Sequence, residues 1–121
     1  MFPYSATSQK RLNSCHKDIQ LIWAELAKLV NTSVFCGHRG QTEQNKAFLD
    51  GKSQLKWPES KHNALPSMAI DSGPYFVDLR NTDWEDHKAY AVFAGYVMCI
   101  ARQLYAEGKI THLVRWGGDW D

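Results

Sequence analysis

A histidine and an aspartate nine residues apart are the first candidates for chemistry in this chain. His62 lies in the polar segment Ser60-Lys61-His62, and Asp71 follows the short apolar run Met68-Ala69-Ile70. A histidine on a loop and an aspartate at a strand end can converge on one point, and both side chains are good Zn²⁺ ligands. Two ligands do not make a zinc site, which needs three protein groups and an open position. The alternative is a surface histidine and an aspartate that begins the turn before Gly73-Pro74.

Arg39 is the second candidate, because it follows a short apolar run on the expected turn into a helix. The rigid guanidinium fork can hold a carboxylate or polarise a carbonyl there, and the alternative is a solvated loop arginine. His38 beside it is expected to be a loop residue and not a ligand. Lys52, Lys56 and Lys61 give the following loop a positive rim, which either suits an anionic substrate or only solvates the loop.

The remaining histidines are expected to be packed or solvated rather than functional. His16 starts a helix and His87 falls inside one, whereas His112 lies on the last expected strand, as a ligand or a half-buried strand residue. The cysteines are odd in number, widely spaced and without a C-x-x-C pair, which predicts free thiols in a reducing compartment and no cysteine-based zinc site. They are Cys15, Cys36 and Cys99.

Composition bounds the class of protein. The chain has 121 residues, 44% hydrophobic and 22% charged, which predicts one soluble globular domain over residues 1–121. Fourteen Lys+Arg against thirteen Asp+Glu give a net charge of +1, so no overall field draws the protein to nucleic acid or a membrane. No apolar run approaches the roughly 18–20 residues that span a bilayer. The start, Met1 to Ser5, lacks signal-peptide features, so a cytoplasmic product is expected.

The elements that must position these side chains follow from periodicity. Apolar residues at helical spacing predict a helix over about 16–30 and a longer one from Thr82 or Asp83 to Gly108, and Thr42 and Gly51 bound a third. After the third helix, from Lys52 to Pro66, the sequence predicts a loop of roughly fifteen residues. Loops of this length are usually functional or disordered. Short apolar runs predict strands at 34–36, 68–70, 75–79 and 113–116. The predicted fold is therefore α+β, a small antiparallel sheet packed against helices.

Three segments resemble, in order, the motifs of a zinc peptidase family. It is the family of D-alanyl-D-alanine carboxypeptidases and L-alanyl-D-glutamate endopeptidases, which includes the vancomycin-resistance D,D-peptidases and many phage endolysins. The resemblance is strongest to the endolysin forms, in which H-N-x-x-P-S-x-A-x-D is a variant of the second motif. The segments are Gly37-His38-Arg39 with Glu43-Gln44-Asn45-Lys46-Ala47-Phe48 and Gly51-Lys52-Ser53, then Ser60-Lys61-His62 through Ala69-Ile70-Asp71, and last Trp116-Gly117-Gly118-Asp119-Trp120.

This resemblance implies a zinc-dependent peptidoglycan peptidase with a D,D-peptidase/hedgehog-like fold. His62 and Asp71 inherit the roles of zinc ligands, Arg39 that of the residue that stabilises the transition state, and Ser60 that of a substrate contact. The implied cofactor is Zn²⁺ and the implied partners are peptidoglycan stem peptides, cut at L-Ala-D-Glu or D-Ala-D-Ala. A phage lysin of this kind acts on the cell wall.

One departure from the family concerns the end of the chain. The family's third zinc ligand is a histidine beyond the W-G-G-D-W motif, preceded by an acidic general base, and this sequence ends at Asp121 before both. Asp119 and Asp121 match the motif and not the base. The sequence therefore predicts a peptidase domain whose C-terminal part is missing, with an unpaired last strand that favours self-association.

Two hypotheses of function follow, from different classes. The first is a peptidoglycan hydrolase of endolysin type. The second is a catalytically inactive module of the same fold, which keeps Arg39 and Ser60 as a pocket that only binds cell-wall peptide or a protein partner. A third arrangement lies between them, in which a neighbouring chain completes the zinc site through His112. Zinc content discriminates them, because only the peptidase must hold the metal.

Overall fold

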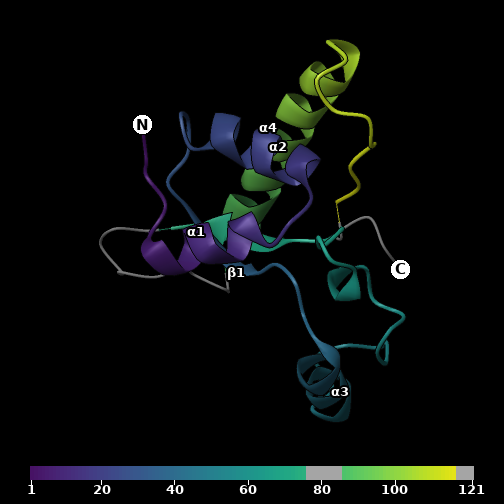
Figure 1. The fold of residues 1–121 in the computed structure, drawn as a ribbon. Coiled ribbons are helices and arrows are strands. Elements are labelled where there is room, and N and C mark those ends of the chain that lie inside the picture. Colours follow the sequence, from purple (N-terminus) through teal and green to yellow (C-terminus); the bar gives the residue numbers. More distant parts are fainter. Residues whose placement is uncertain (76–85, 117–121) are drawn as a thin grey trace.

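A two-stranded antiparallel sheet joins the helices of this protein. The computed structural model describes residues 1–75 and 86–116 (Figure 1). Within them, β1 (Thr32–Cys36) pairs with β2 (Asp71–Pro74). The helices are α1 (Ala6–Asn13), α2 (Lys17–Leu26), α3 (Gln41–Leu49) and α4 (His87–Ala106), with a short 3-10 helix at Lys61–Asn63.

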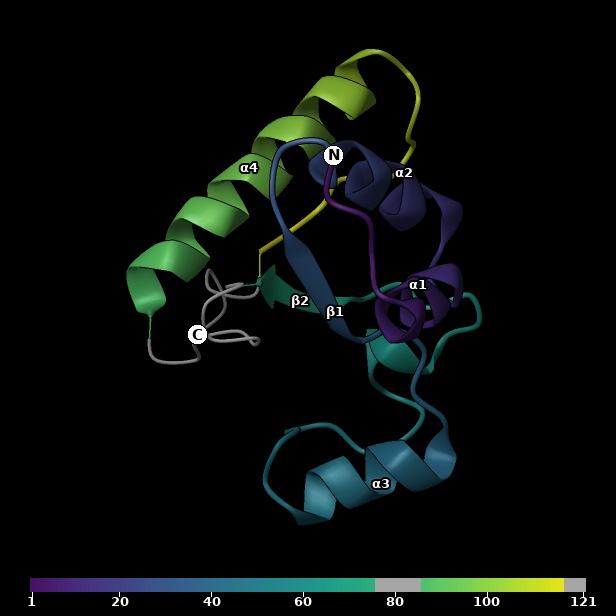
Figure 2. The same ribbon diagram turned by 90° about the vertical axis from the view of Figure 1, so that its left-hand side faces the viewer.

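The helices form two groups around the sheet. In the first group α1 packs against β1 and touches α2, and α4 packs against both α2 and β2. α3 and the loop after it lie apart from the other helices in both views (Figures 1 and 2). The chain thus has a packed body and a projecting α3 arm, and β1 leads from one to the other.

The hydrophobic core lies between α2, α4 and the sheet. Trp23 of α2 is buried and donates its indole N–H to Ser72 Oγ at 3.0 Å, and Ser72 donates to the Ser33 carbonyl at 2.6 Å, so α2 is tied to both strands. The cluster of buried side chains comprises Leu12, Ile22, Trp23, Leu26, Val34, Phe93, Val97, Ile100, Ala101, Leu104 and Ile110.

The sheet register places one candidate residue directly. Thr32 pairs with Pro74 and Val34 with Ser72, but an irregularity after Val34 brings Cys36 opposite Asp71. Asp71 therefore opens β2 beside the carboxyl end of β1.

The α+β class and the three predicted helices are confirmed, with shifted boundaries. The first predicted helix is α2, and it ends at Leu26 rather than near residue 30. α3 begins after Gly40, so Thr42 is not its N-cap, and its buried side chain is Gln44, whereas Ala47 and Phe48 are half-buried. The predicted starts of the long helix at Thr82 or Asp83, and most of the 75–79 strand, lie outside the described residues.

Two strand predictions and one omission need correction. The strand placed at 68–70 is instead β2, a few residues later. α1 was not predicted, because only Ser8 and Leu12 of its residues are buried and no apolar stripe marks it. The prediction of a strand at 113–116 is wrong. These residues are described and form no strand, and Leu113 is 76% exposed.

The backbone before Leu113 is held by a side chain rather than by a sheet. The buried carboxylate of Asp18 accepts from the amide N–H groups of Thr111 at 3.0 Å and His112 at 3.2 Å. Burial raises the pKa of Asp18, but hydrogen bonds from His112 and Thr111 outweigh it and hold that pKa below its ordinary value.

None of the helices in the described part of the chain combines the length and the hydropathy that a membrane-spanning helix needs.

The predicted stops at Gly51 and Gly108 are confirmed. Both glycines follow the last helical turn with positive φ, 75° and 74°. Gly108 donates to the Tyr105 carbonyl at 3.0 Å and Lys109 donates to that of Leu104 at 2.9 Å, which is the Schellman pattern of a left-handed helix end.

Alanine at two glycines of the same helix should change stability in opposite directions. Gly108→Ala forces a side chain into the left-handed region and should lower the free energy of unfolding by about 1 kcal/mol. Gly95 lies inside α4 with open space around the position of a Cβ, so Gly95→Ala should raise it by about 0.5–1 kcal/mol. Urea unfolding monitored by circular dichroism measures both, and a stabilised Gly108→Ala variant would contradict the assigned helix end.

Candidate active site

Arg39, His62 and Asp71 meet beside the carboxyl end of β1. Asp71 Oδ2 lies 3.4 Å from Arg39 Nη2 and also 3.4 Å from His62 Nε2. The arginine and histidine side chains are 17% and 12% exposed, whereas that of Asp71 is 53% exposed. The structure thus brings together three of the four site residues proposed from the sequence, with the carboxylate facing solvent.

The carbonyl of Gly37 orients the His62 ring. His62 Nδ1 lies 2.8 Å from Gly37 O, which leaves Nε2 directed toward Asp71. The buried Ser67 hydroxyl donates to the same carbonyl at 3.2 Å. Gly37 has no room for a side chain, because a Cβ there would collide with the Arg11 carbonyl at the end of α1. The contact between α1 and the end of β1 therefore determines where the Gly37 carbonyl points.

Ser60 positions His62 from the other side. It is the N-cap of the 3-10 helix, and its hydroxyl accepts from the His62 amide N–H at 3.2 Å. Asn63 completes a capping box by accepting from the Ser60 amide at 3.0 Å. The structure thus gives Ser60 a role in holding the histidine-bearing turn; its contact with substrate remains a prediction.

Gln44 is the buried centre of the α3 arm. Its side-chain oxygen accepts from Arg39 Nη1 and from Asn63 Nδ2, both at 3.1 Å. Its side-chain nitrogen donates to Ser53 Oγ at 2.9 Å and to the Leu55 carbonyl at 2.6 Å. One fully buried amide therefore ties the arginine, the histidine turn and the long loop together.

The charges of the site stabilise one another. Burial lowers the pKa of His62, but hydrogen bonds to Asp71, Cys36 and Gly37 outweigh it and raise that pKa to about 10. Burial raises the pKa of Asp71, but the hydrogen bond and charge of His62 and the charge of Arg39 hold it below its ordinary value. The metal-free site is therefore a histidinium–carboxylate pair beside a guanidinium.

Cys36 offers a further possible metal ligand at the site, its Sγ atom. Ligand atoms of Cys36, His62 and Asp71 all lie within 4.8 Å of one another. Burial raises the pKa of the Cys36 thiol, but His62 and Arg39 outweigh it and lower that pKa. Nitrogen, oxygen and sulfur donors suit Zn²⁺, and a zinc-bound histidine ordinarily donates its other ring N–H to a carbonyl or carboxylate, as His62 Nδ1 can to Gly37. The residues present therefore fit a zinc ion.

The other candidates lie outside this group. His38 contacts the Ala64 carbonyl at 2.9 Å, and the three loop lysines Lys52, Lys56 and Lys61 are exposed. His112, considered as a ligand from a neighbouring chain, contacts Asp18 of its own chain at 2.7 Å. Of the third motif, Trp116 is 40% exposed and residues 117–120 are outside the described part of the chain.

Three residues that contact Arg39, His62 or Asp71 were not proposed as site residues from the sequence. They are Cys36, Gly37 and Gln44. All three belong to or adjoin the first motif. For Cys36 the sequence offered a signal, the apolar run that ends at this residue. Because Gly37 follows directly, the side chain of Cys36 had to lie next to the turn that carries Arg39. Gln44 carried no comparable signal, since a glutamine on a short helix is ordinarily solvated.

Comparison with known proteins identifies the family and the fold of the chain. A sequence model of the family described as phage L-alanyl-D-glutamate peptidase matches residues 1–121. The crystal structure of the Serratia marcescens L-Ala D-Glu endopeptidase ChiX is similar at 25% sequence identity with a TM-score of 0.67, over 98% of this chain and 81% of ChiX. No curated protein matches the chain. The resemblance drawn from the three motifs, and the fold that it implies, are confirmed.

The metal-free protein should lose stability as the pH rises through the alkaline range. His62 has a pKa of about 10 when folded against 6.5 for the free side chain, so its contribution is complete below about pH 6.5 and is lost toward pH 10. Because the side chain of Asp71 is 53% exposed and solvent screens the pair, the expected loss is about 1–2 kcal/mol.

Urea unfolding in EDTA at several pH values between 6.5 and 9.5 measures this loss. His62→Gln should lack this part of the pH slope, and His87→Gln, a change at an exposed histidine of α4, should keep it. Equal slopes in the parent chain and His62→Gln would show that His62 is not the titrating group.

Proposed function

Since the chain belongs to the phage L-alanyl-D-glutamate peptidase family, we propose that it hydrolyses the L-Ala–D-Glu bond of peptidoglycan stem peptides with a zinc ion. The observation that carries the proposal is the convergence of Arg39 and His62 on Asp71 Oδ2, each at 3.4 Å. An imidazole, a carboxylate and a guanidinium at one point are the parts needed for metal-assisted amide hydrolysis.

His62 and Asp71 are the proposed zinc ligands, through Nε2 and Oδ2. Zinc, when bound there, supplies an acidified water and polarises the scissile carbonyl. His62 must give up its Nε2 proton to ligate, while its Nδ1–H stays on the Gly37 carbonyl and keeps the ring oriented. Cys36 Sγ, within 4.8 Å of ligand atoms of both residues, is the third donor that the described part of the chain offers to this zinc.

Arg39 is the proposed catalytic residue that stabilises the oxyanion developing on the scissile carbonyl. Its side chain is fixed by Gln44 at Nη1, so the guanidinium is positioned before substrate arrives. Its Nη2 points to the carboxylate of Asp71 and so lies beside the proposed metal position. Donors held in place in this way favour the transition state because they need no reorganisation during the reaction.

The long loop supplies the proposed contacts with substrate. Ser60 borders the histidine turn, and the exposed side chains of Lys52, Lys56 and Lys61 give the loop its positive rim. The D-Glu residue of a stem peptide carries a free carboxylate, which such lysines attract. Of the two bonds considered from the sequence, L-Ala–D-Glu is favoured over D-Ala–D-Ala by the family and by ChiX.

Digestion of purified peptidoglycan tests the proposal. The zinc-loaded chain should release fragments with a new D-Glu amino terminus, detected by mass spectrometry. Arg39→Lys keeps the charge but loses the fork, so kcat/KM should fall by about 100-fold while zinc content is unchanged. Arg102→Lys, a change at an exposed arginine of α4, is the matched control and should retain the parent activity.

Three results would contradict the proposal. Release of D-Ala alone would identify a D,D-carboxypeptidase, and undiminished cleavage after zinc removal would exclude metal-assisted hydrolysis. Binding of stem peptides without any cleavage would instead support the inactive binding module considered from the sequence.

A further inference from the structure

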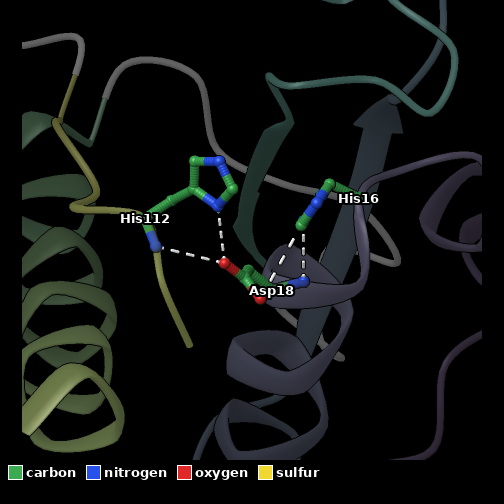
Figure 3. Close-up of side chains that lie close together, drawn as sticks. All are labelled: His16, Asp18 and His112. Atoms are coloured by element: carbon green, nitrogen blue, oxygen red, sulfur yellow. Dashed lines mark hydrogen bonds and ion pairs between the residues drawn. The ribbon is translucent and has the colours of Figure 1, made fainter. Parts of the chain in front are cut away.

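A second group of metal-ligating side chains lies where α2 begins and the chain after α4 passes it. His16 is the N-cap of α2, Asp18 lies in the first turn of that helix, and His112 comes from the segment that follows α4 (Figure 3). In Figure 3 the two imidazoles flank the carboxylate from opposite sides. We propose that these three residues bind a divalent transition-metal ion, such as Zn²⁺, at a site separate from that of His62 and Asp71.

The donor atoms are already close to a coordination geometry. One ligand atom from each of the three residues lies within 4.8 Å of the others. Asp18 Oδ2 is 2.7 Å from His112 Nδ1, and Asp18 Oδ1 is 3.9 Å from His16 Nδ1. Two donors on one tetrahedral zinc lie about 3.3 Å apart, as bonds of about 2.0–2.1 Å require.

Entry of a metal requires a local change at both histidines, because each Nδ1 already holds a hydrogen bond, that of His16 with the Asp18 amide and that of His112 with Asp18 Oδ2. The Asp18 side chain is 4% exposed, and the His16 ring is held by the Asp18 amide N–H, which donates to Nδ1 at 3.1 Å. The His112 side chain is 49% exposed, so its ring has room to turn toward solvent once the 2.7 Å contact with Asp18 Oδ2 is given up. The ring centroids of the two histidines are 4.8 Å apart at an interplanar angle of 72°, so the rings meet edge to face and are not stacked.

The buried charge of Asp18 gives a reason for a cation here. Within residues 1–75 and 86–116, the only cationic partners of this carboxylate are His16 and His112, which carry charge only when protonated. Its other contacts are the amide N–H groups of Thr111 and His112 and the Thr111 hydroxyl. Buried carboxylates are ordinarily paired with a cation or bound to a metal, and a divalent ion would supply that charge.

The donor set also selects the class of metal. Two imidazole nitrogens and one carboxylate oxygen suit Zn²⁺, Co²⁺, Ni²⁺ or Cu²⁺, whereas Mg²⁺ and Ca²⁺ prefer oxygen ligands throughout. A metal held by all three residues would tie the start of α2 to the segment after α4. Because it binds the folded chain, it would raise the midpoint of thermal unfolding.

Zinc titration of a chain without the first site tests the proposal. The background is His62→Ala, which removes a ligand proposed for catalysis and none of this cluster. In it, about one zinc per chain should bind, measured by competition with a chromophoric chelator, and zinc should raise the thermal midpoint. Adding His112→Gln keeps an amide that can donate to Asp18 but removes the imidazole, so zinc affinity should fall at least about tenfold.

The controls separate a site from surface binding and from misfolding. His87→Gln in the same background changes an exposed histidine outside the cluster and should leave zinc affinity unchanged. Circular dichroism without metal checks that each variant is folded, and His16→Gln serves as an independent second removal of a ligand. The proposal is overturned if the His62→Ala chain binds no zinc, or if neither glutamine variant of the cluster weakens binding. Either result leaves the peptidase proposal untouched, because the residues proposed for cleavage, Arg39, His62 and Asp71, are not members of this cluster.

Discussion

The hydrogen bond between the Gly37 carbonyl and His62 Nδ1 is the contact on which the candidate active site depends. It leaves one ring nitrogen to face Asp71, and it exists only because β1 ends at Cys36 and the chain turns immediately afterwards. That turn lies against α1 so closely that residue 37 must be glycine. The position of a single imidazole therefore follows from the packing of a helix that lies far from it in sequence.

The turn between β1 and α3 contributes the arginine, and one buried amide of α3 holds this turn and the α3 arm together. Gln44 would be costly to bury without partners, and here its oxygen and nitrogen together serve Arg39, Asn63, Ser53 and Leu55. Since α3 lies apart from the other helices, these bonds replace the apolar packing that fixes α2 and α4. The site is thus placed where a polar arm meets an apolar body, with the carboxylate of Asp71 open to solvent.

The sequence predicted the features that neighbouring residues alone decide. The apolar face of α2 and the two glycine helix ends were predicted because periodicity and backbone freedom decide them, and the convergence of His62 and Asp71 was proposed from a loop histidine and a strand-end aspartate. The 113–116 strand failed because a distant carboxylate, that of Asp18, takes the amides just before it. Gln44 could not be assigned for the same reason, because its role comes from contacts with residues outside its own helix. The three motifs predicted more than the hydrophobic periodicity did, because their order along the chain identified the family.

The proposed reaction requires that His62 bind the metal through Nε2 while Nδ1 stays protonated on the Gly37 carbonyl. The most direct test is a zinc titration followed by nitrogen NMR of the histidine rings, which resolves His62 from the four other histidines of the chain. We expect His62 to change from doubly protonated to a neutral ring, with the Nε2 resonance shifted by the metal and Nδ1 still carrying its proton. Unchanged His62 resonances at saturating zinc, or ligation through Nδ1, would contradict it.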